Sequence, residues 1–134
     1  MAYPLTGTTT ATAIKEREYA TAAVIKFTKF TSCIGVIAKK GDEMTAVHLA
    51  MRATDGSDFD TAAATAVLDL LPKDPDAAAI FGCISMWENP DNRVLAGFQK
   101  LTGTLETLTK FQKYTFVDGE YGAKIEDGDI EITY

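Results

Sequence analysis

Hydrophobic and polar positions alternate with a period of two in the first part of the chain. Val24–Phe30 is rich in β-branched and aromatic residues, and the alternation places Ile25 and Phe27 on one face. Ile34–Ala38 follows as a short apolar, β-branched run of the kind found in buried strands. Met44–Met51 is a third apolar run. We therefore predict successive strands over these three segments.

A period of three to four residues replaces this alternation in two later segments. The apolar positions from Phe59 to Leu71 predict a helix over residues 58–71, with Ser57 or Asp58 as its N-cap and Pro72 just beyond its end. A second stripe spans residues 94–108 and predicts a helix over about 92–110, opened by Asn89-Pro90-Asp91.

The remaining segments read as strands. Ala79–Trp87 is an apolar run between the two helices. Near the C-terminus, Asp-Gly pairs at 118–119 and 127–128 are hairpin signals. We therefore predict a meander of three strands over Lys113–Val117, Tyr121–Glu126 and Asp129–Tyr134.

This order of elements predicts an α/β or α+β domain in which two main helices pack on a mixed sheet, as a layered sandwich. The 134 residues, with 46% hydrophobic and 24% charged side chains, correspond to one globular domain over 1–134. Residues 1–13 are small and rich in Thr and Ala, which favours a flexible, frayed segment.

The charge balance restricts the partners. The formal net charge is −6 at pH 7, whereas nucleic acids and anionic membranes are bound by basic surfaces. A neutral or basic protein, or a small polar substrate, fits better. The sequence has no basic segment followed by an apolar signal run and no apolar run long enough to span a bilayer. We expect a cytoplasmic protein, or one exported without a cleaved signal peptide.

The chain has two cysteines and one histidine, too few for a disulfide scaffold or a His-rich metal site. We therefore predict no metal and no cofactor. Cys33 and His48 lie on consecutive predicted strands, which are usually neighbours in a sheet. Such a pair can act as nucleophile and base. The alternative is that both residues simply belong to the core.

Three residues around the strand over 79–87 have similar alternatives. Cys83 lies mid-strand and is expected to pack in the core. Gly82 can mark a bulge or a close approach of two backbone segments. Trp87 lies where a strand meets a helix start, whose free N–H groups can bind a ligand or be capped locally.

Several segments resemble the CheD-type chemoreceptor glutamine deamidases, with which toxins of the cytotoxic-necrotising-factor type share a Cys–His core. Phe30–Val36 is similar to that family's Gly-Ser-Cys-Val-Ala-Val stretch, and Met44–Leu49 to its next strand, which carries the histidine. Ala79–Glu88 resembles a later strand that ends in a glycine turn and a Ser-Met-aromatic corner. The resemblance covers residues 19 to about 130 in order, and it implies a CheD-like fold.

The resemblance also implies roles for individual residues. Cys33 corresponds to the nucleophile and His48 to the base. The family's histidine-orienting threonine corresponds most nearly to Thr28, shifted by one residue, and Thr31 or Ser32 could replace it. Thr31 also stands where the family has a glycine. The residues that the resemblance places around the substrate are Ser32, Gly82, Cys83 and Trp87.

Three functions follow as hypotheses. The first is a protein-glutamine deamidase, whose substrate is a glutamine on a partner protein. The second is a catalytically inactive CheD-like module that binds a protein, and the third is a small structural or assembly protein. A catalytic Cys33 should be exposed with a depressed pKa, whereas a structural one should be inert. An assembly protein should show an extended hydrophobic interface and no cleft at Cys33. The oligomeric state is not implied by the sequence.

Overall fold

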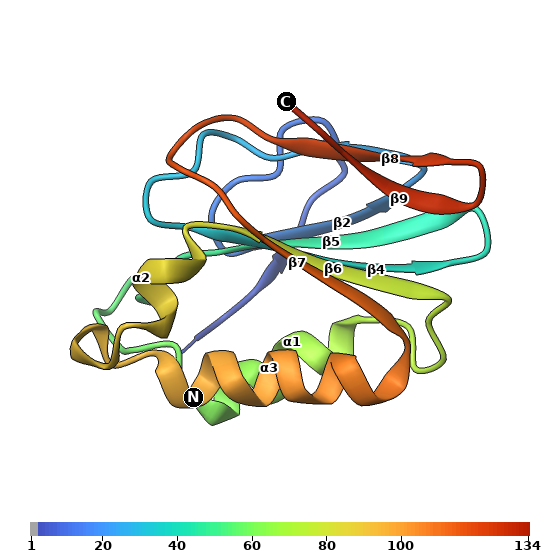
Figure 1. Cartoon of the computed structure of the whole chain (residues 1–134). Coiled ribbons are helices and arrows are strands. Elements are labelled where there is room, and N and C mark those ends of the chain that lie inside the picture. The colour runs from blue at the N-terminus through green and yellow to red at the C-terminus, as the bar shows by residue number, and fades with distance from the viewer. Residues whose placement is uncertain (1–2) are drawn as a thin grey trace.

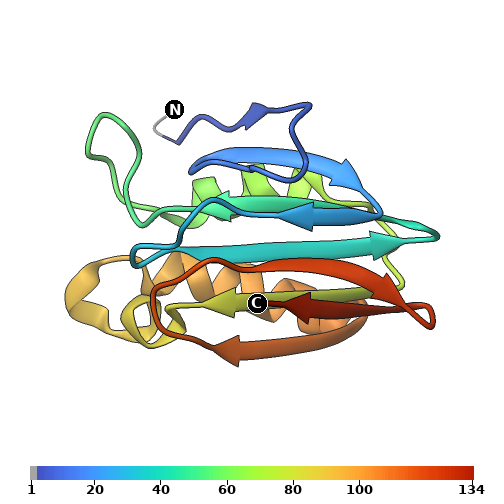
Figure 2. The same cartoon turned by 90° about the horizontal axis from the view of Figure 1, so that it is seen from above.

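The computed structural model of the chain describes residues 3–134 as three stacked layers (Figure 1). Helices α1 (Thr61–Leu70) and α3 (Leu95–Leu108) form one outer layer. A mixed sheet forms the middle layer, and a smaller antiparallel sheet forms the other outer layer, as the view from above in Figure 2 shows. The predicted fold class, a layered α/β sandwich with two main helices, is confirmed.

The larger sheet has six strands in the described chain, in the order β1-β2-β5-β4-β6-β7. The β1–β2 and β6–β7 pairs are parallel and the other pairs antiparallel. The smaller sheet has the order β3-β8-β9 and is antiparallel. The strands are β1 (Thr6–Gly7), β2 (Glu18–Ala22), β3 (Val24–Lys26), β4 (Ile34–Lys40), β5 (Glu43–Leu49), β6 (Ala77–Gly82), β7 (Lys110–Thr115), β8 (Gly122–Glu126) and β9 (Asp129–Thr133).

Two hydrophobic cores lie on the two faces of the larger sheet. Ile34 and Val36 of β4 face the helices, whereas Cys33 and Ile37 face the smaller sheet. This alternation follows from the period of two along a strand, because successive side chains point to opposite faces. Cys33 therefore belongs to the core between the two sheets.

The predicted helices are confirmed with shorter bounds. Helix α1 begins at Thr61 because Asp60, rather than Ser57 or Asp58, is its N-cap, and the Asp60 carboxylate accepts a hydrogen bond of 2.9 Å from the Ala63 N–H. Helix α3 begins at Leu95 because Pro90–Asn92 forms a short 3-10 turn, η1, before it.

Two predicted strands end early. The segment predicted over 24–30 pairs only as β3, and its continuation forms isolated bridges at Phe27 and Phe30. The strand predicted over 79–87 ends at Gly82, and Ile84–Glu88 forms helix α2 instead. The backbone of Gly82 has φ of 129°, a conformation that turns the chain out of the sheet and is readily adopted only by glycine.

The predicted C-terminal meander is partly wrong. Asp127 and Gly128 have φ of 52° and 80° and form the tight turn between β8 and β9, as expected. Asp118 and Gly119, however, do not form a hairpin, because β7 pairs with β6 in the larger sheet and β8 pairs in the smaller one. Residues 116–121 instead carry the chain from one sheet to the other.

Part of the N-terminal segment, which the sequence predicted to be flexible over residues 1–13, packs against the rest of the domain. Tyr3 is 1% exposed, and its hydroxyl accepts a hydrogen bond of 3.0 Å from the Ala50 N–H. Strand β1 pairs with β2. The aromatic Tyr3 and the apolar Ile14 hold both ends of a segment whose own composition is polar and small. Residues 1–2 lie outside the described chain.

Among residues 3–134, no helix has the length and apolar character that crossing a bilayer requires.

Candidate functional site

The register of β4 and β5 brings Cys33 and His48 together. Gly35 lies directly opposite His48 in this antiparallel pair, so the two residues share a face of the sheet. Cys33 lies two residues before Gly35 and is therefore the diagonal neighbour of His48 on that face. Because Gly35 has no side chain, the Phe27 ring occupies the space where a Cβ would lie, and it packs edge-on against the His48 imidazole at 5.5 Å between centroids.

His48 is fully buried, and within residues 3–134 its imidazole ring makes one hydrogen bond. Its Nδ1 lies 2.8 Å from the Ile14 carbonyl oxygen. A carbonyl only accepts, so Nδ1 carries the proton and Nε2 has a free lone pair. Nε2 is buried and has no hydrogen-bond partner among the described residues. Burial is the main cause that lowers the pKa of His48, so the ring is neutral at neutral pH.

The Cys33 thiol is also fully buried. Its Sγ lies 3.2 Å from Glu16 Oε2 and 3.4 Å from the Thr31 carbonyl oxygen, and it can donate to either. The pKa of this thiol is raised to about 12, mainly by burial and also by the neighbouring Glu16 carboxylate, which repels a thiolate. In this conformation Cys33 is therefore a neutral thiol.

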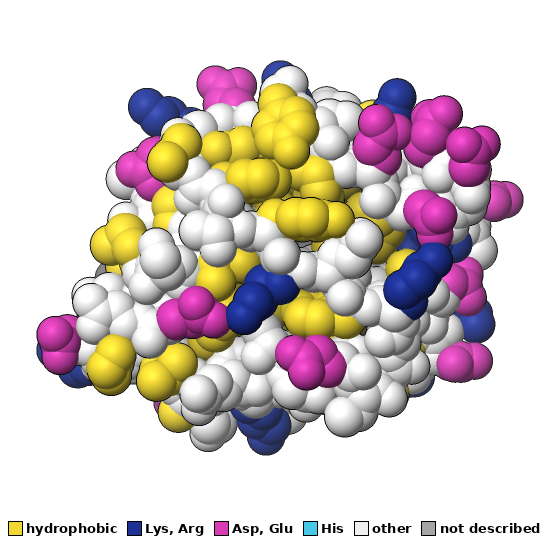
Figure 3. Space-filling view, viewed as in Figure 1, with side chains coloured by type: hydrophobic (Ala, Val, Ile, Leu, Met, Phe, Trp, Pro, Cys, Tyr) yellow, Lys and Arg dark blue, Asp and Glu magenta, His cyan; other side chains and the backbone are white. Residues whose placement is uncertain are grey.

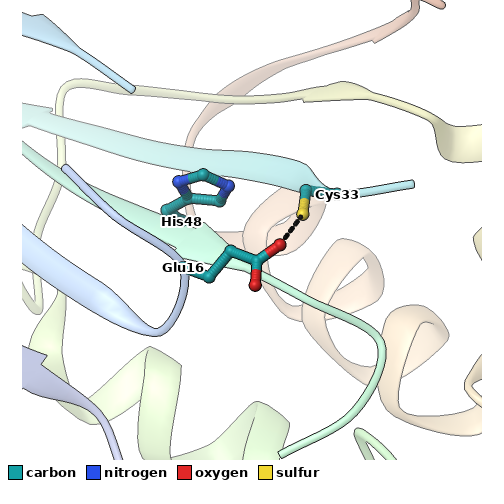
Figure 4. Close-up of side chains that lie close together, drawn as sticks. All are labelled: Glu16, Cys33 and His48. Carbon is teal, nitrogen blue, oxygen red and sulfur yellow. Dashed lines mark hydrogen bonds between the residues drawn. The ribbon is translucent and has the colours of Figure 1, made fainter. Parts of the chain in front are cut away.

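Glu16 is the member of the site that the sequence analysis missed. It comes from the loop before β2, and its side chain is 40% exposed, near Arg17. Three atoms that could ligate a metal lie within 4.8 Å of one another: a carboxylate oxygen of Glu16, the sulfur of Cys33 and an imidazole nitrogen of His48. Figure 4 shows the carboxylate beside the thiol, and the His48 ring nitrogen farther from the backbone turned toward Cys33. In the sequence, Glu16 stands out only as part of the charged run Lys15–Glu18, which leads into β2.

The two threonines singled out in the sequence have different positions. Thr28 Oγ1 donates to the Ile14 carbonyl at 3.4 Å, and His48 Nδ1 donates to the same oxygen. The Ile14 carbonyl therefore orients the imidazole, the role that the resemblance gave to Thr28. Thr31 is exposed and contributes its carbonyl oxygen to the Cys33 thiol.

Ser32 and Trp87 support the turn that presents Cys33. The Ser32 backbone has φ of 61°, and its N–H donates to Asp118 Oδ1 at 2.9 Å. The Trp87 indole N–H donates to the Ser32 carbonyl at 2.9 Å, and the Trp87 side chain is fully buried. In this conformation Trp87 fixes the turn from behind and presents no surface to a substrate.

Gly82 and Cys83 lie against the backbone of Cys33. A Cβ on Gly82 would lie 2.5 Å from the Cys33 carbonyl oxygen, so the two strands approach as closely as a glycine permits. The Cys83 N–H donates to that oxygen at 3.0 Å. The Cys83 thiol donates to Asp118 Oδ1 at 2.9 Å, and its pKa is raised to about 11, mainly by burial and then by Asp118.

A groove of about 530 Å³ lies at a different place, at the open edge between β7 and β9. Tyr114, Phe116 and Tyr134 line it together with polar residues, and none of Glu16, Cys33 and His48 does. Hydrophobic side chains gather on this face of the molecule (Figure 3). In the described chain this groove is therefore separate from the thiol and the imidazole.

Comparison with known proteins gives no family for this chain. No protein-family model matches it, and no curated protein matches it.

Proposed function

We propose that this protein is a cysteine-dependent amide hydrolase that converts a glutamine side chain of a partner protein to glutamate. One observation carries this proposal. His48 Nε2 is a buried base with a free lone pair, turned toward the Cys33 thiol, while Nδ1 is fixed by the Ile14 carbonyl. A base that is oriented on one side and faces a thiol on the other is the arrangement that nucleophilic catalysis requires.

The reaction begins with a change at Glu16. In the resting form the thiol donates to the Glu16 carboxylate rather than to the imidazole. Glu16 comes from an exposed loop, so its side chain can turn outward without disturbing either sheet. Its departure removes the charge that opposes a thiolate and opens a path from solvent to Sγ. The thiol proton then passes to His48 Nε2.

The chemical steps follow from this pair. The Cys33 thiolate attacks the side-chain amide carbon of the glutamine, and the protonated His48 gives its proton to the departing nitrogen. Ammonia leaves and a thioester remains. His48 then takes a proton from water, the hydroxide attacks the thioester, and glutamate is released as the thiol regains its proton. The net reaction consumes one water and releases one ammonia.

The compartment and partner follow from simpler properties. Both cysteines are free, which fits a reducing compartment such as the cytoplasm. Export without a cleaved signal is equally compatible with two free thiols. The net charge of −6 at pH 7 favours a neutral or basic protein partner over nucleic acid.

A second candidate function is supported by the burial of Cys33. A thiol with no exposed surface and a pKa of about 12 has the properties expected of an inert core residue. The protein would then be a binding or assembly module without catalysis. Its contact surface would be the groove between β7 and β9, where Tyr134 is 85% exposed.

Alkylation of Cys33 by iodoacetamide separates the two functions. In a Cys83→Ser background Cys33 is the one remaining thiol. Replacing Glu16 by Gln removes the carboxylate charge, and we expect Cys33 to react roughly tenfold faster near neutral pH, the effect of one pKa unit. In the Glu16→Gln background, adding His48→Asn should slow the labelling again, because the base that takes the thiol proton is then missing. Glu120→Gln, which removes an exposed carboxylate near Lys26, is the matched control.

The same variants test hydrolysis directly. Ammonia release from reduced, unfolded lysozyme, a basic protein that contains glutamine, should rise in Glu16→Gln and vanish in Cys33→Ser. A labelling rate that is indifferent to both Glu16 and His48, without ammonia release, would leave the binding module as the function.

A further inference from the structure

The arrangement of Glu16, Cys33 and His48 is also that of an incomplete metal site. The three donor atoms lie within 4.8 Å of one another, and the sulfur and the carboxylate oxygen are 3.2 Å apart. Four-coordinate zinc has bonds of roughly 2.0–2.3 Å to such ligands, so neighbouring ligand atoms lie about 3.3–3.8 Å apart. The other two separations are at most 4.8 Å, so the ligand atoms must approach by up to about 1 Å, through rotation of the Cys33 side chain and of the partly exposed Glu16 side chain.

The imidazole of His48 already has the orientation and protonation of a metal ligand. Nδ1 donates to the Ile14 carbonyl, which is the second contact that metal-binding histidines usually make and that fixes the lone pair on Nε2. Nε2 is fully buried and has no partner within residues 3–134. A buried polar atom without a partner calls for an explanation, and a bound cation supplies one.

The donor types select the class of cation. Sulfur, imidazole nitrogen and carboxylate oxygen together suit zinc and its neighbours, whereas calcium and magnesium prefer oxygen alone. A thiolate and a carboxylate bring two negative charges to a divalent cation. Binding releases the thiol proton to solvent as the sulfur–metal bond forms, so the cation replaces that proton in the buried site. Glu16 lies at the solvent side and gives the ion an entry path.

We propose that Glu16, Cys33 and His48 bind one zinc-class divalent cation, with a fourth coordination position left open. Cys33 and His48 come from adjacent strands and Glu16 from a loop distant in sequence from both. This is why ligand spacing in the sequence did not predict a metal. One consequence rests on the function proposed above: a sulfur bound to the cation is not available as the nucleophile, so the metal-loaded protein is the inactive form of the hydrolase.

Cobalt(II) added to the chelator-treated protein is the test, because it reports its ligands in the absorption spectrum. We expect one equivalent to bind, with the near-ultraviolet charge-transfer band of a cobalt–thiolate bond and the visible bands of a four-coordinate ion. Zinc(II) should displace it. Cys33→Ser should abolish the charge-transfer band, and His48→Asn and Glu16→Gln should each weaken binding by about a hundredfold or more. Cys83→Ser is the matched control and should keep the band.

The absence of a charge-transfer band in the wild-type protein, or a band that survives in Cys33→Ser, would overturn the proposal. The measurement needs no substrate, so its outcome is independent of hydrolysis. Cobalt binding in a protein that releases no ammonia after chelation would refute the proposed function alone. Ammonia release without cobalt binding would refute the metal site alone.

Discussion

Lowering the pH should destabilise the folded protein through a single side chain. His48 is the one histidine of the chain, and burial holds its pKa below 6.5 in the folded state. In the unfolded chain the imidazole returns to a pKa of about 6.5. Below that pH the unfolded state binds a proton that the folded state does not bind. The stabilisation from a neutral His48 is therefore complete above about pH 6.5 and is lost as the pH falls toward the depressed folded pKa.

The size of this loss of stability follows from the one proton that the unfolded chain binds at His48. Between about pH 7.5 and pH 5.5, protonation of a group of pKa about 6.5 favours the unfolded state by up to about 1.4 kcal/mol, the limit for a folded ring that stays neutral. With a urea dependence of about 2 kcal/mol per molar, the unfolding midpoint should fall by up to about 0.7 M. Asp76 and Asp118 have folded pKa values below 3.8, so they act at lower pH and do not disturb this window.

Urea unfolding followed by tryptophan fluorescence measures the shift. Trp87 is the one tryptophan and is fully buried, so its emission reports unfolding of the helix-side core. A chelator keeps the site free of metal. His48→Asn is the control, because an amide can still donate to the Ile14 carbonyl but does not titrate. An equal loss of stability in the wild type and in His48→Asn would refute the neutral, buried imidazole, and with it the free lone pair on Nε2.

Two further predictions concern the scaffold around the site. Gly82→Ala should lower the free energy of unfolding by about 3 kcal/mol or more, because its backbone φ is 129° and its Cβ would lie 2.5 Å from the Cys33 carbonyl oxygen. Asp60→Ala should cost about 1 kcal/mol, because the Ala63 N–H loses its capping acceptor. Urea unfolding measures both losses.

Each of these substitutions has a control in the same chain. Gly103→Ala places a Cβ in open space within α3 and should stabilise the protein by up to about 1 kcal/mol. A similar gain in Gly82→Ala would mean that the close approach to Cys33 is absent. Asp60→Asn keeps an acceptor oxygen and should retain most of the stability. A full loss in Asp60→Asn would assign the effect of Asp60 to its charge.

The sequence was sufficient to predict the part of the candidate site that lies on paired strands. Cys33 and His48 lie on two consecutive apolar runs joined by a short turn. Such runs usually pair with each other, so the proximity of the two residues could be predicted. Glu16 could not be predicted in this way. Its position depends on how the loop before β2 folds over the sheet, and that path is held by long-range hydrogen bonds such as the one from the Arg17 N–H to the His48 carbonyl.

The errors in the predicted strands have the same origin. A run of β-branched and aromatic residues predicts an extended chain, but it does not say which sheet the chain joins. Val24–Lys26 leaves the larger sheet to pair with β8, and Lys110–Thr115 joins β6 instead of its neighbour in sequence. Tertiary contacts decide which sheet each of these strands joins, and local strand propensity carries no information about that choice. The Asp-Gly pair at 127–128 was predicted correctly because its two strands are also its spatial neighbours.

The pairing of β3 with β8 determines the order in which parts of the protein can fold. Val24 pairs with Lys124, so the smaller sheet joins two ends of the chain that are far apart in sequence. Contacts of this kind are slow to form, and during synthesis they cannot form until the residues of β8 have left the ribosome. Until then Phe27, Phe30 and Cys33 lack the sheet that covers them. The thiol is therefore open to oxidants and metals in the nascent chain, and folding itself closes that period of exposure.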